Sequence, residues 1–285
     1  MMNVKRRTIL QSGGIASVLW ASAATRSFAQ NDAKRSAMHV NIVVVPDMVQ
    51  LDITGPFEVL SRTPGWTVDL VAATPEAVRT DRGLRLLPTI TRSTAKTSNI
   101  LVVPGGTGID TAMLDAEWID YVRRECAKCD YVFGVCTGSL LLGAAGVLKG
   151  KRAGGHWQSR YLLSQFGAVM SNDRMTRDGN IYTSGGVTSG IDMALRVVGD
   201  LAGSEVAQKI QLAMEYDPAP PFAGGTPYTS PPEIVTAVLK DSTQRRALRE
   251  TMVAQAARTS NAVTVDISVN VAALGAQASE RHRGQ

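Results

Sequence analysis

The chain has 285 residues, a hydrophobic fraction of 44% and a formal net charge of +5. These values are ordinary for a globular protein with a buried core. Much of the positive charge lies close to the two ends of the sequence, and no basic stretch is interleaved with aromatic residues, so binding to nucleic acid is not expected.

The first 29 residues resemble a twin-arginine export signal. The Arg6-Arg7 pair opens the pattern, an apolar segment follows over 13–24, and Ser27-Phe28-Ala29 provides a small-residue cleavage site. The apolar segment is shorter than the ~20 residues of a membrane-spanning helix, and an uncleaved anchor is the alternative. We therefore expect a signal peptide over 1–29, a polar linker over 30–38, a periplasmic mature protein and no stable membrane association after cleavage.

Apolar, β-branched runs predict buried strands, and prolines or glycines mark their ends. In the first half of the chain the expected strands are 39–45, 66–72, 84–90 and 100–103, the third being a short piece that can pair with 78–81 as a hairpin. A helix is expected to begin near Thr54–Pro56, because proline suits the first turn of a helix.

The second half of the chain is mostly helical in pattern. Helices are expected over 117–129, 136–148, 159–166, 185–213 and 234–257, with a strand over 131–135, a hairpin over 174–184 and a proline-rich loop over 218–232. One domain is therefore expected over 39–257. Residues 258–285 are rich in Ala, Ser and Asn and are expected to be mostly disordered.

Strands that alternate with helices predict an α/β fold, with a doubly wound, mostly parallel sheet and helices on both faces. In such sheets ligands bind beyond the carboxyl ends of the strands. Asp52, the Gly105-Gly106 pair and Cys136 each come after a predicted strand. We therefore expect these residues to meet at one edge of the sheet.

The segment Gly134-Val135-Cys136-Thr137-Gly138 lies between a predicted strand and a predicted helix, which is typical of a nucleophile elbow. Its glycines lack a Cβ atom, so the turn can be tight. A thiol at the start of a helix faces free N–H groups and the helix macrodipole, and we expect Cys136 to favour the thiolate. The alternative is a small buried cysteine without a chemical role.

The other two cysteines, Cys126 and Cys129, form a C-x-x-C pair at the end of a predicted helix. Two cysteines alone make a poor zinc site, and a thioredoxin-like motif would stand at a strand-to-helix junction. A structural role is expected, with a local disulfide as one form of it in an oxidising periplasm. Cys136 is then the odd thiol.

Three motifs resemble those of the DJ-1/PfpI superfamily, in its order and spacing. They are Asp52-Ile53-Thr54-Gly55-Pro56, Val103-Pro104-Gly105-Gly106-Thr107-Gly108 and Val135-Cys136-Thr137-Gly138-Ser139. More narrowly, the segments 51–56, 136–138, 155–157 and 215–222 look like the isonitrile hydratase branch, which adds water to an isonitrile to give an N-substituted formamide. The resemblance implies a flavodoxin-like fold related to the class I glutamine amidotransferases, a small-molecule substrate, a homodimer, no metal and no organic cofactor.

An isonitrile carbon needs a soft nucleophile and a proton source. We expect Cys136 to attack it and form a thioimidate, with Asp52 as the neighbouring acid and base, and Thr137 as a donor through its N–H and hydroxyl. Backbone N–H groups of Gly105 and Gly106 are expected to hold developing negative charge. Alternatives stay open: Asp52 as a helix cap, Thr137 as an ordinary first-turn residue, and the glycines as turn formers.

Three further residues are candidates for a substrate pocket: His156, Trp157 and Phe222. His156 also raises the question of a Cys–His pair, and Trp157 suits core packing equally well. Superfamily peptidases and glyoxalase- or deglycase-type members carry histidine directly after the cysteine. Thr137 stands there in this chain, which disfavours peptidase activity.

Two readings compete with a hydratase. One is another thiol-dependent hydrolase, amidase or carbonyl-repair enzyme of the superfamily. The other is a non-enzymatic redox or ligand sensor that acts through Cys136. A sensor of the DNA-binding type would carry a helix-turn-helix domain, for which the ~45 residues after Lys240 are too few by typical domain sizes.

Overall fold

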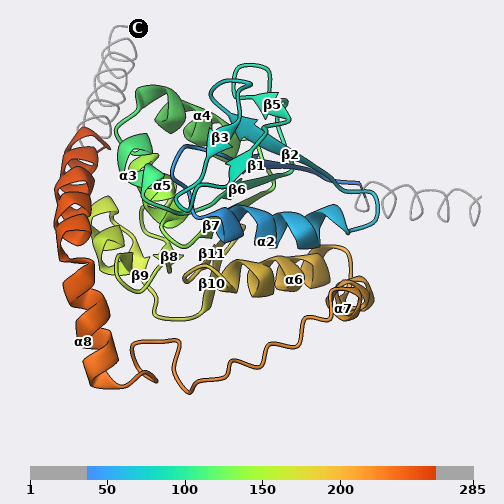
Figure 1. Cartoon of the computed structure of the whole chain (residues 1–285). Helices are drawn as coiled ribbons and strands as arrows, with labels where there is room; N and C mark the ends of the chain where they lie inside the picture. Colours follow the sequence, from blue (N-terminus) through green and yellow to red (C-terminus); the bar gives the residue numbers. More distant parts are fainter. Residues whose placement is uncertain (1–36, 261–285) are drawn as a thin grey trace, which may run out of the picture.

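A seven-stranded sheet forms the centre of the computed structural model, which describes residues 37–260 (Figure 1). The strand order is β10-β11-β7-β6-β1-β2-β5, and every neighbouring pair is parallel except β10 and β11. The strands are β1 (His39–Val43), β2 (Thr67–Ala72), β5 (Ile90–Thr91), β6 (Ile100–Val103), β7 (Tyr131–Val135), β10 (Met175–Asp178) and β11 (Ile181–Ser184). The expected doubly wound, mostly parallel sheet is confirmed.

The middle of the sheet is buried on both faces, which explains its sequence. Strands β6 and β7 read Ile-Leu-Val-Val and Tyr-Val-Phe-Gly-Val, and all but Tyr131 of these residues are buried. Parallel strands covered by helices on both sides read as such continuous apolar runs. The carboxyl ends of β1, β6, β7 and β11 therefore lie side by side, because these strands are neighbours in the parallel part of the sheet.

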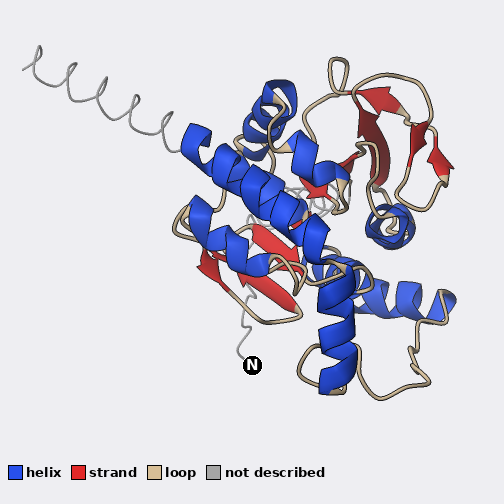
Figure 2. Cartoon of the chain, turned by 60° about the vertical axis from the view of Figure 1, so that its left-hand side comes forward, coloured by secondary structure: helices blue, strands red, loops and turns tan. Residues whose placement is uncertain are grey.

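Helices cover both faces of the sheet. Helices α2 (Gln50–Ser61) and α6 (Ser189–Leu201) pack against each other on one face, and α3 (Gly108–Ala112), α4 (Ala116–Cys126) and α5 (Gly138–Ala144) lie on the other (Figures 1 and 2). The side chain of Asp115 caps α4 by accepting the N–H groups of Glu117 and Trp118.

The remaining elements lie outside the main sheet. Two small sheets pair β3 (Val78–Arg79) with β4 (Arg85–Leu86), and β8 (Arg152–Ala153) with β9 (Val169–Met170). The first is the hairpin expected from the sequence. A 3-10 helix, η1 (Arg160–Phe166), precedes β9, and α7 (Ser204–Ala213) and α8 (Pro232–Asp241) follow α6.

Two helix predictions need correction. Helix α2 begins at Gln50 and not near Thr54, so Pro56 lies inside the helix. The proline removes the bond to the carbonyl of Asp52, four residues earlier. The single helix expected over 185–213 is two helices, α6 and α7, separated at Gly203, whose φ of 102° is incompatible with a continuing α-helix.

The closing helix expected over 234–257 is likewise interrupted. It is α8 followed, after a turn at Ser242, by a helix over 243–260, which runs along one side of the molecule (Figure 1). The helix therefore continues three residues beyond the expected boundary at Ala257. The predicted leader over 1–29, most of the linker, and residues 261–285 of the predicted tail lie outside the described residues. Within residues 37–260 no helix is both long and apolar enough to cross a membrane.

Candidate active site

Cys136 occupies the turn between β7 and α5 with a φ of 58°. This left-handed conformation is uncommon for a residue other than glycine and is typical of functional turns. It is held from both sides: the Cys136 N–H donates to the carbonyls of Ser184 and Gly185, both at 3.1 Å, and its carbonyl accepts the N–H of His156 at 3.2 Å. The strand-turn-helix geometry matches the expectation from the sequence.

The tightness of this turn depends on Gly138. A Cβ atom at that position would lie 1.9 Å from the carbonyl oxygen of Val103, at the end of the neighbouring strand β6. The absence of a side chain lets the start of α5 pack directly on β6. The Cys136 sulfur is thereby held beside the loop that follows β6, and only 4% of the residue is exposed.

Asp52 lies next to this sulfur, on the first turn of α2. It is fully buried, its Oδ2 accepts the N–H of Gly105 at 3.0 Å, and Oδ2 lies beside Cys136, since one point at the Cβ position of Gly105 is 2.8 Å from both Oδ2 and Cys136 Cβ. Its Oδ1 has no hydrogen-bond partner among the described residues. The alternative that Asp52 caps its own helix is wrong, because the N-cap residue is Val49 and no side chain caps the helix.

Burial shifts the pKa values of both groups upward. Desolvation raises the pKa of Asp52 to about 7, although hydrogen bonds from Cys136 and Gly105 act in the opposite direction. Burial, and then the charge of Asp52, raise the pKa of Cys136 well above its usual value, despite the N–H groups of Val187 and Thr137 that point to the sulfur. The expected thiolate is therefore wrong for the resting site, since the loss of hydration outweighs the start of a seven-residue helix.

The Gly105-Gly106 loop joins the acid to the nucleophile. A Cβ atom on Gly105 would lie 2.6 Å from the Thr137 nitrogen and 2.8 Å from both Asp52 Oδ2 and Cys136 Cβ. The Gly106 N–H donates to Thr137 Oγ1 at 2.9 Å, and the Thr137 hydroxyl donates to the Gly106 carbonyl at 3.1 Å.

These partners change the roles expected for the backbone donors. The N–H groups of Gly105 and Gly106 are already engaged by Asp52 and Thr137, so the geometry contradicts their expected role toward developing charge. The N–H groups that reach the sulfur are those of Thr137 and Val187.

A buried arginine from the helix over 243–260 fixes the same loop. Arg249 is 6% exposed and forms a bidentate ion pair with Asp110 of α3, at 2.6 and 3.0 Å. It also donates to Ser159 Oγ at 3.0 Å and to the Gly106 carbonyl at 3.3 Å. The last helix of the described chain thus reaches the backbone on which Thr137 and Asp52 depend.

His156 contributes its backbone, not its imidazole, to the nucleophile. The ring packs against Gly186, and its Nδ1 accepts the N–H of Gln158 at 3.3 Å. Burial, followed by the charges of Arg249, Arg245 and Arg160, lowers the pKa of His156 to about 4. A neutral imidazole that makes no hydrogen bond to the thiol rules out the Cys–His pair.

A pocket of about 310 Å³ is lined by residues that neighbour Cys136, whereas neither Cys136 nor Asp52 lines it. Three of its walls are the segments 155–157, 172–174 and 185–189, and residues 225–228 of the proline-rich segment form the fourth together with Arg160. Gly155, Gly185, His156 and Val187 of this lining also touch the backbone or sulfur of Cys136. The pocket is therefore separated from the buried thiol by residues that contact Cys136 directly, although Cys136 itself does not line it.

Two of the three residues expected in a substrate pocket line this cavity. His156 and Trp157 line it, with their ring centroids 6.0 Å apart. Phe222 does not: it is 84% exposed and lines an adjoining depression, which shares Arg174, Thr188, Gly225 and Thr226 with the pocket. The proline-rich loop leaves the Phe222 side chain exposed, which its sequence spacing could not indicate.

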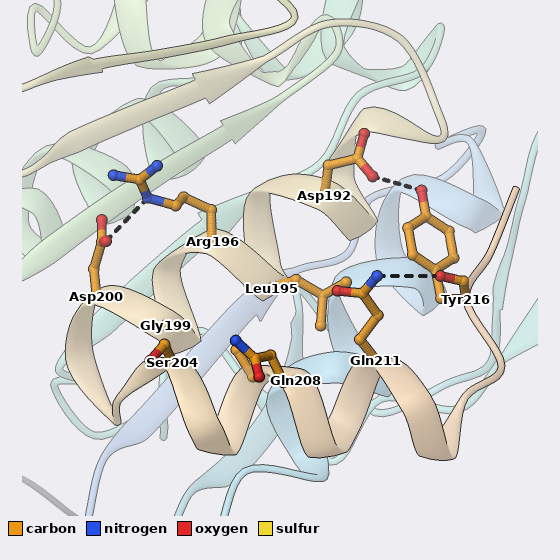
Figure 3. A pocket seen from close by; sticks show the side chains of 10 residues that line it. Asp192, Leu195, Arg196, Gly199, Asp200, Ser204, Gln208, Gln211 and Tyr216 are labelled. Carbon is orange, nitrogen blue, oxygen red and sulfur yellow. Dashed lines mark hydrogen bonds and ion pairs between the residues drawn. The ribbon is translucent and has the colours of Figure 1, made fainter.

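A second hollow, between α6 and α7, holds no nucleophile (Figure 3). Its acids are paired: Tyr216 donates to Asp192 at 2.5 Å, and Arg196 donates to Asp200 at 2.9 Å.

Cys126 and Cys129 lie on α4 and just after it, and both are free thiols, so the structure does not contain the disulfide considered from the sequence.

Sequence reasoning missed several residues of the site. Val187, with a φ of 37°, presents its N–H to the sulfur from the turn between β11 and α6. The preceding Gly185-Gly186 pair was a signal for such a turn. Arg249 and Asp110 gave no signal, because 138 intervening residues separate them and neither belongs to a motif.

Comparison with known proteins adds independent information. Residues 38–200 match the family model described as "DJ-1/PfpI family". The chain is 42% identical over 221 residues to "Isonitrile hydratase" of Pseudomonas putida, covering 78% of this chain and 97% of that one. It is 26% identical over 191 residues to "Protein DJ-1alpha" of Drosophila melanogaster, with coverage of 65% and 87%.

Among solved structures, a THiJ/PfpI family protein from Pseudomonas syringae superposes with a TM-score of 0.75 and 36% identity. The match covers 76% of this chain and 90% of that one. Similarity to these proteins therefore spans the sheet and the elements that carry Asp52, Gly105 and Cys136.

Proposed function

We propose, for a chain that belongs to the DJ-1/PfpI family, that it is a hydratase that converts isonitriles to N-substituted formamides without a cofactor. The observation that carries the proposal is the buried position of the Asp52 carboxyl beside Cys136: a single point, the Cβ position of Gly105, lies 2.8 Å from both Asp52 Oδ2 and Cys136 Cβ. The 42% identity to an isonitrile hydratase supports the choice of reaction.

The resting pair holds the proton that the reaction needs. The pKa of Cys136 is raised and that of Asp52 is about 7, so near neutral pH the sulfur is protonated and about half of the carboxyl groups are ionised. An ionised Asp52 is the general base for the thiol, since its buried carboxyl lies beside Cys136. The nucleophile is thus activated by proton transfer and not by a lowered thiol pKa.

In the first step the sulfur attacks the terminal carbon of the isonitrile. The S–H proton passes to Asp52, the S–C bond forms, and Asp52 returns the proton to the same carbon, which gives a thioimidate, R–N=CH–S. The N–H groups of Thr137 and Val187 stabilise the sulfur while it is anionic. The Thr137 hydroxyl keeps the Gly106 loop, and with it the Gly105 contact to Asp52, in place.

In the second step water hydrolyses the thioimidate. Asp52 accepts a proton from the water as its oxygen adds to the carbon and passes this proton to the nitrogen, and it then transfers the hydroxyl proton of the adduct to the departing sulfur. The C–S bond then breaks, the sulfur regains a proton, and the product R–NH–CHO leaves. The two steps together consume one isonitrile and one water, and they restore both side chains.

The competing functions have less support at this site. Peroxide sensing favours an accessible thiol of low pKa, whereas Cys136 is buried with a raised pKa. A peptidase of the superfamily would use a histidine base, and the imidazole of His156 does not reach the sulfur. A thiol-dependent hydrolase of a small amide remains the second candidate, because the same Cys136–Asp52 pair would serve it.

The direct test is conversion of cyclohexyl isocyanide to N-cyclohexylformamide by the purified protein. We expect turnover by the wild type, none by Cys136→Ser, and undiminished turnover by Cys129→Ser, which changes another buried cysteine outside the pocket. Absence of the formamide with the wild type would refute the proposed function. Release of ammonia from small amides would then favour the second candidate.

A further inference from the structure

The pocket beside Cys136 contains one guanidinium that has no carboxylate partner among residues 37–260. Arg160 donates through Nη1 to the Asn172 carbonyl at 3.3 Å and through Nη2 to the Tyr228 hydroxyl at 3.0 Å, and both acceptors are neutral. Its guanidinium carbon lies 5.9 Å from the centre of the Tyr228 ring. A guanidinium fork matches a carboxylate in two parallel hydrogen bonds.

The other charged groups of this pocket are already paired. Arg174 donates to Asp192, and Asp192 is held from its other side by the Tyr216 hydroxyl (Figure 3). Asp173 accepts a hydrogen bond from the Ser171 hydroxyl at 2.9 Å and forms an ion pair with Arg152 at 3.3 Å. Arg160 is therefore the charge in the pocket that is left for a ligand.

Arg160 is also linked to Cys136 through the backbone of His156. Its N–H donates to the His156 carbonyl at 2.9 Å, and the His156 N–H donates to the Cys136 carbonyl at 3.2 Å. Trp157 and Tyr228 supply aromatic surface in the same pocket. A small ligand in this pocket would lie along the aromatic wall with one end at Arg160 and the other toward His156 and Val187, which contact Cys136.

The field in this region favours an anion. The charges of Arg249, Arg245 and Arg160 all act on His156 and oppose its protonation. The carboxylate of Asp110 is already engaged in the ion pair with Arg249. A neutral ligand would gain nothing from this potential, whereas a carboxylate would be attracted by it.

We propose that the preferred substrates are isonitriles that carry a carboxylate, which Arg160 binds while the isocyano carbon meets the Cys136 sulfur. The inference rests on the proposed hydratase function and names its substrate class. The carboxylate takes no part in bond making: an isocyano carboxylate and water give the N-formylamino carboxylate through the two steps above. Arg160 is a binding residue, so its contribution falls on KM and not on kcat.

The test compares acids with their esters. Isocyanoacetate and 4-isocyanobutanoate, each beside its methyl ester, are assayed with wild type and with Arg160→Gln. In the wild type we expect kcat/KM for the better acid to exceed that for its ester by about tenfold, as one hydrogen-bonded charge pair gives. In Arg160→Gln we expect the KM of the acid to rise by about the same factor. The kcat for the acid, and both kcat and KM for the ester, should stay at their wild-type values.

Arg124→Gln is the matched control, because it makes the same change of charge on α4 outside the pocket. It should leave the preference for the acid intact. Added salt should raise the KM of the acid and not that of the ester. Equal kcat/KM for acid and ester at both chain lengths, or an acid preference that survives in Arg160→Gln, would overturn the inference.

A second measurement separates this inference from the hydratase function. N-formylglycine, the product expected from isocyanoacetate, should slow alkylation of Cys136 by iodoacetamide, read by mass spectrometry of the peptide that contains it. Its methyl ester should protect less, and Arg160→Gln should remove the difference. If no isonitrile is converted, the proposed function fails, and this protection still shows whether Arg160 binds a carboxylate beside the thiol. Equal protection by acid and ester contradicts the role of Arg160.

Discussion

At the scale of single residues, Asp52 shows why a functional group can oppose stability. The carboxyl is fully buried, and its pKa of about 7 lies above the 3.8 of an ordinary aspartate. The folded chain therefore holds this proton more tightly than the unfolded chain. Its contribution to stability falls as the pH rises from 3.8 through about 7, because ionisation is easier in the unfolded state.

We expect Asp52→Asn to lose most activity and to gain stability at alkaline pH. Loss of the base should lower kcat by roughly 10²-fold or more. The free energy of unfolding, relative to wild type, should be higher at pH 8 than at pH 5 by roughly 2 kcal/mol. Urea denaturation of both proteins at the two pH values measures this. His156 has the opposite pH dependence: its pKa of about 4 makes stability fall as the pH drops from 6.5 to 4. Because both proteins contain His156, its effect cancels when the unfolding free energy of wild type is subtracted from that of the variant.

The dependence of activity on pH should follow the same carboxyl. Because the ionised form of Asp52 accepts the thiol proton, kcat/KM for an isonitrile should rise with pH and level off above an apparent pKa of about 7. The apparent value belongs to the coupled Cys136–Asp52 pair. A profile that is already flat from pH 5 to 8 would contradict the role of Asp52 as base.

Gly105 offers a test of how closely the site is packed. A methyl group there would meet the Thr137 nitrogen, Asp52 Oδ2 and Cys136 Cβ at 2.8 Å or less. We expect Gly105→Ala to push these groups apart and reduce kcat by about 10²-fold, as misplacement by ~1 Å does elsewhere. Gly199→Ala on α6 is the control, since its new methyl group would have an ordinary contact of 3.7 Å. Equal activity of the two variants would argue against the close packing of acid and nucleophile around Gly105.

At the scale of elements, the helix over 243–260 is bound to the site by one buried ion pair. Arg249→Met leaves Asp110 buried without its partner and should cost about 3–5 kcal/mol of unfolding free energy. The double variant Arg249→Met/Asp110→Leu should lose clearly less unfolding free energy than Arg249→Met, because it leaves no unpaired buried charge. Arg258→Met, at an exposed position of the same helix, should stay within about 0.5 kcal/mol of wild type. Chemical denaturation measures the unfolding free energy of all three variants. An Arg249→Met variant as stable as wild type would contradict the pairing of Arg249 with Asp110.

The elements were predictable where local pattern decides them. Strands such as 100–103 and the turn at Cys136 follow from apolar runs that end at prolines or glycines. The break at Gly203 was missed because one glycine in an otherwise helical pattern is often tolerated. The start of α2 was misplaced because Pro56 was taken for a first-turn residue, although the helix accommodates it in its interior.

At the scale of the whole molecule, the parallel sheet explains which parts of the site could be anticipated. Residues that follow β1, β6 and β7 were expected at one edge, and Asp52, Gly105 and Cys136 meet there. The protonation state of the sulfur could not be anticipated, since it depends on burial. Arg249 and the direction of Phe222 depend on how the last 45 described residues fold back, and periodicity carries no information about that path.

The predicted leader can be tested in a host that has a twin-arginine export pathway. We expect the periplasmic fraction to contain a chain that begins at Gln30, as read by N-terminal sequencing. Replacing Arg6 and Arg7 together with lysine should leave the protein in the cytoplasm. Arg26→Lys, a similar change in the same leader, should be exported normally. Export of the twin-lysine variant would point to another route.

The hydrogen bond from Arg249 to Gly106 predicts how truncation of the chain would affect activity. The family match ends at residue 200, yet Arg249, which donates to the Gly106 carbonyl, comes from a later helix. A fragment cut at that boundary would keep Asp52, Cys136 and Thr137 and still lack Arg249, together with one wall of the substrate pocket. Libraries of truncated clones screened for turnover should therefore yield no active member that stops before the final helix.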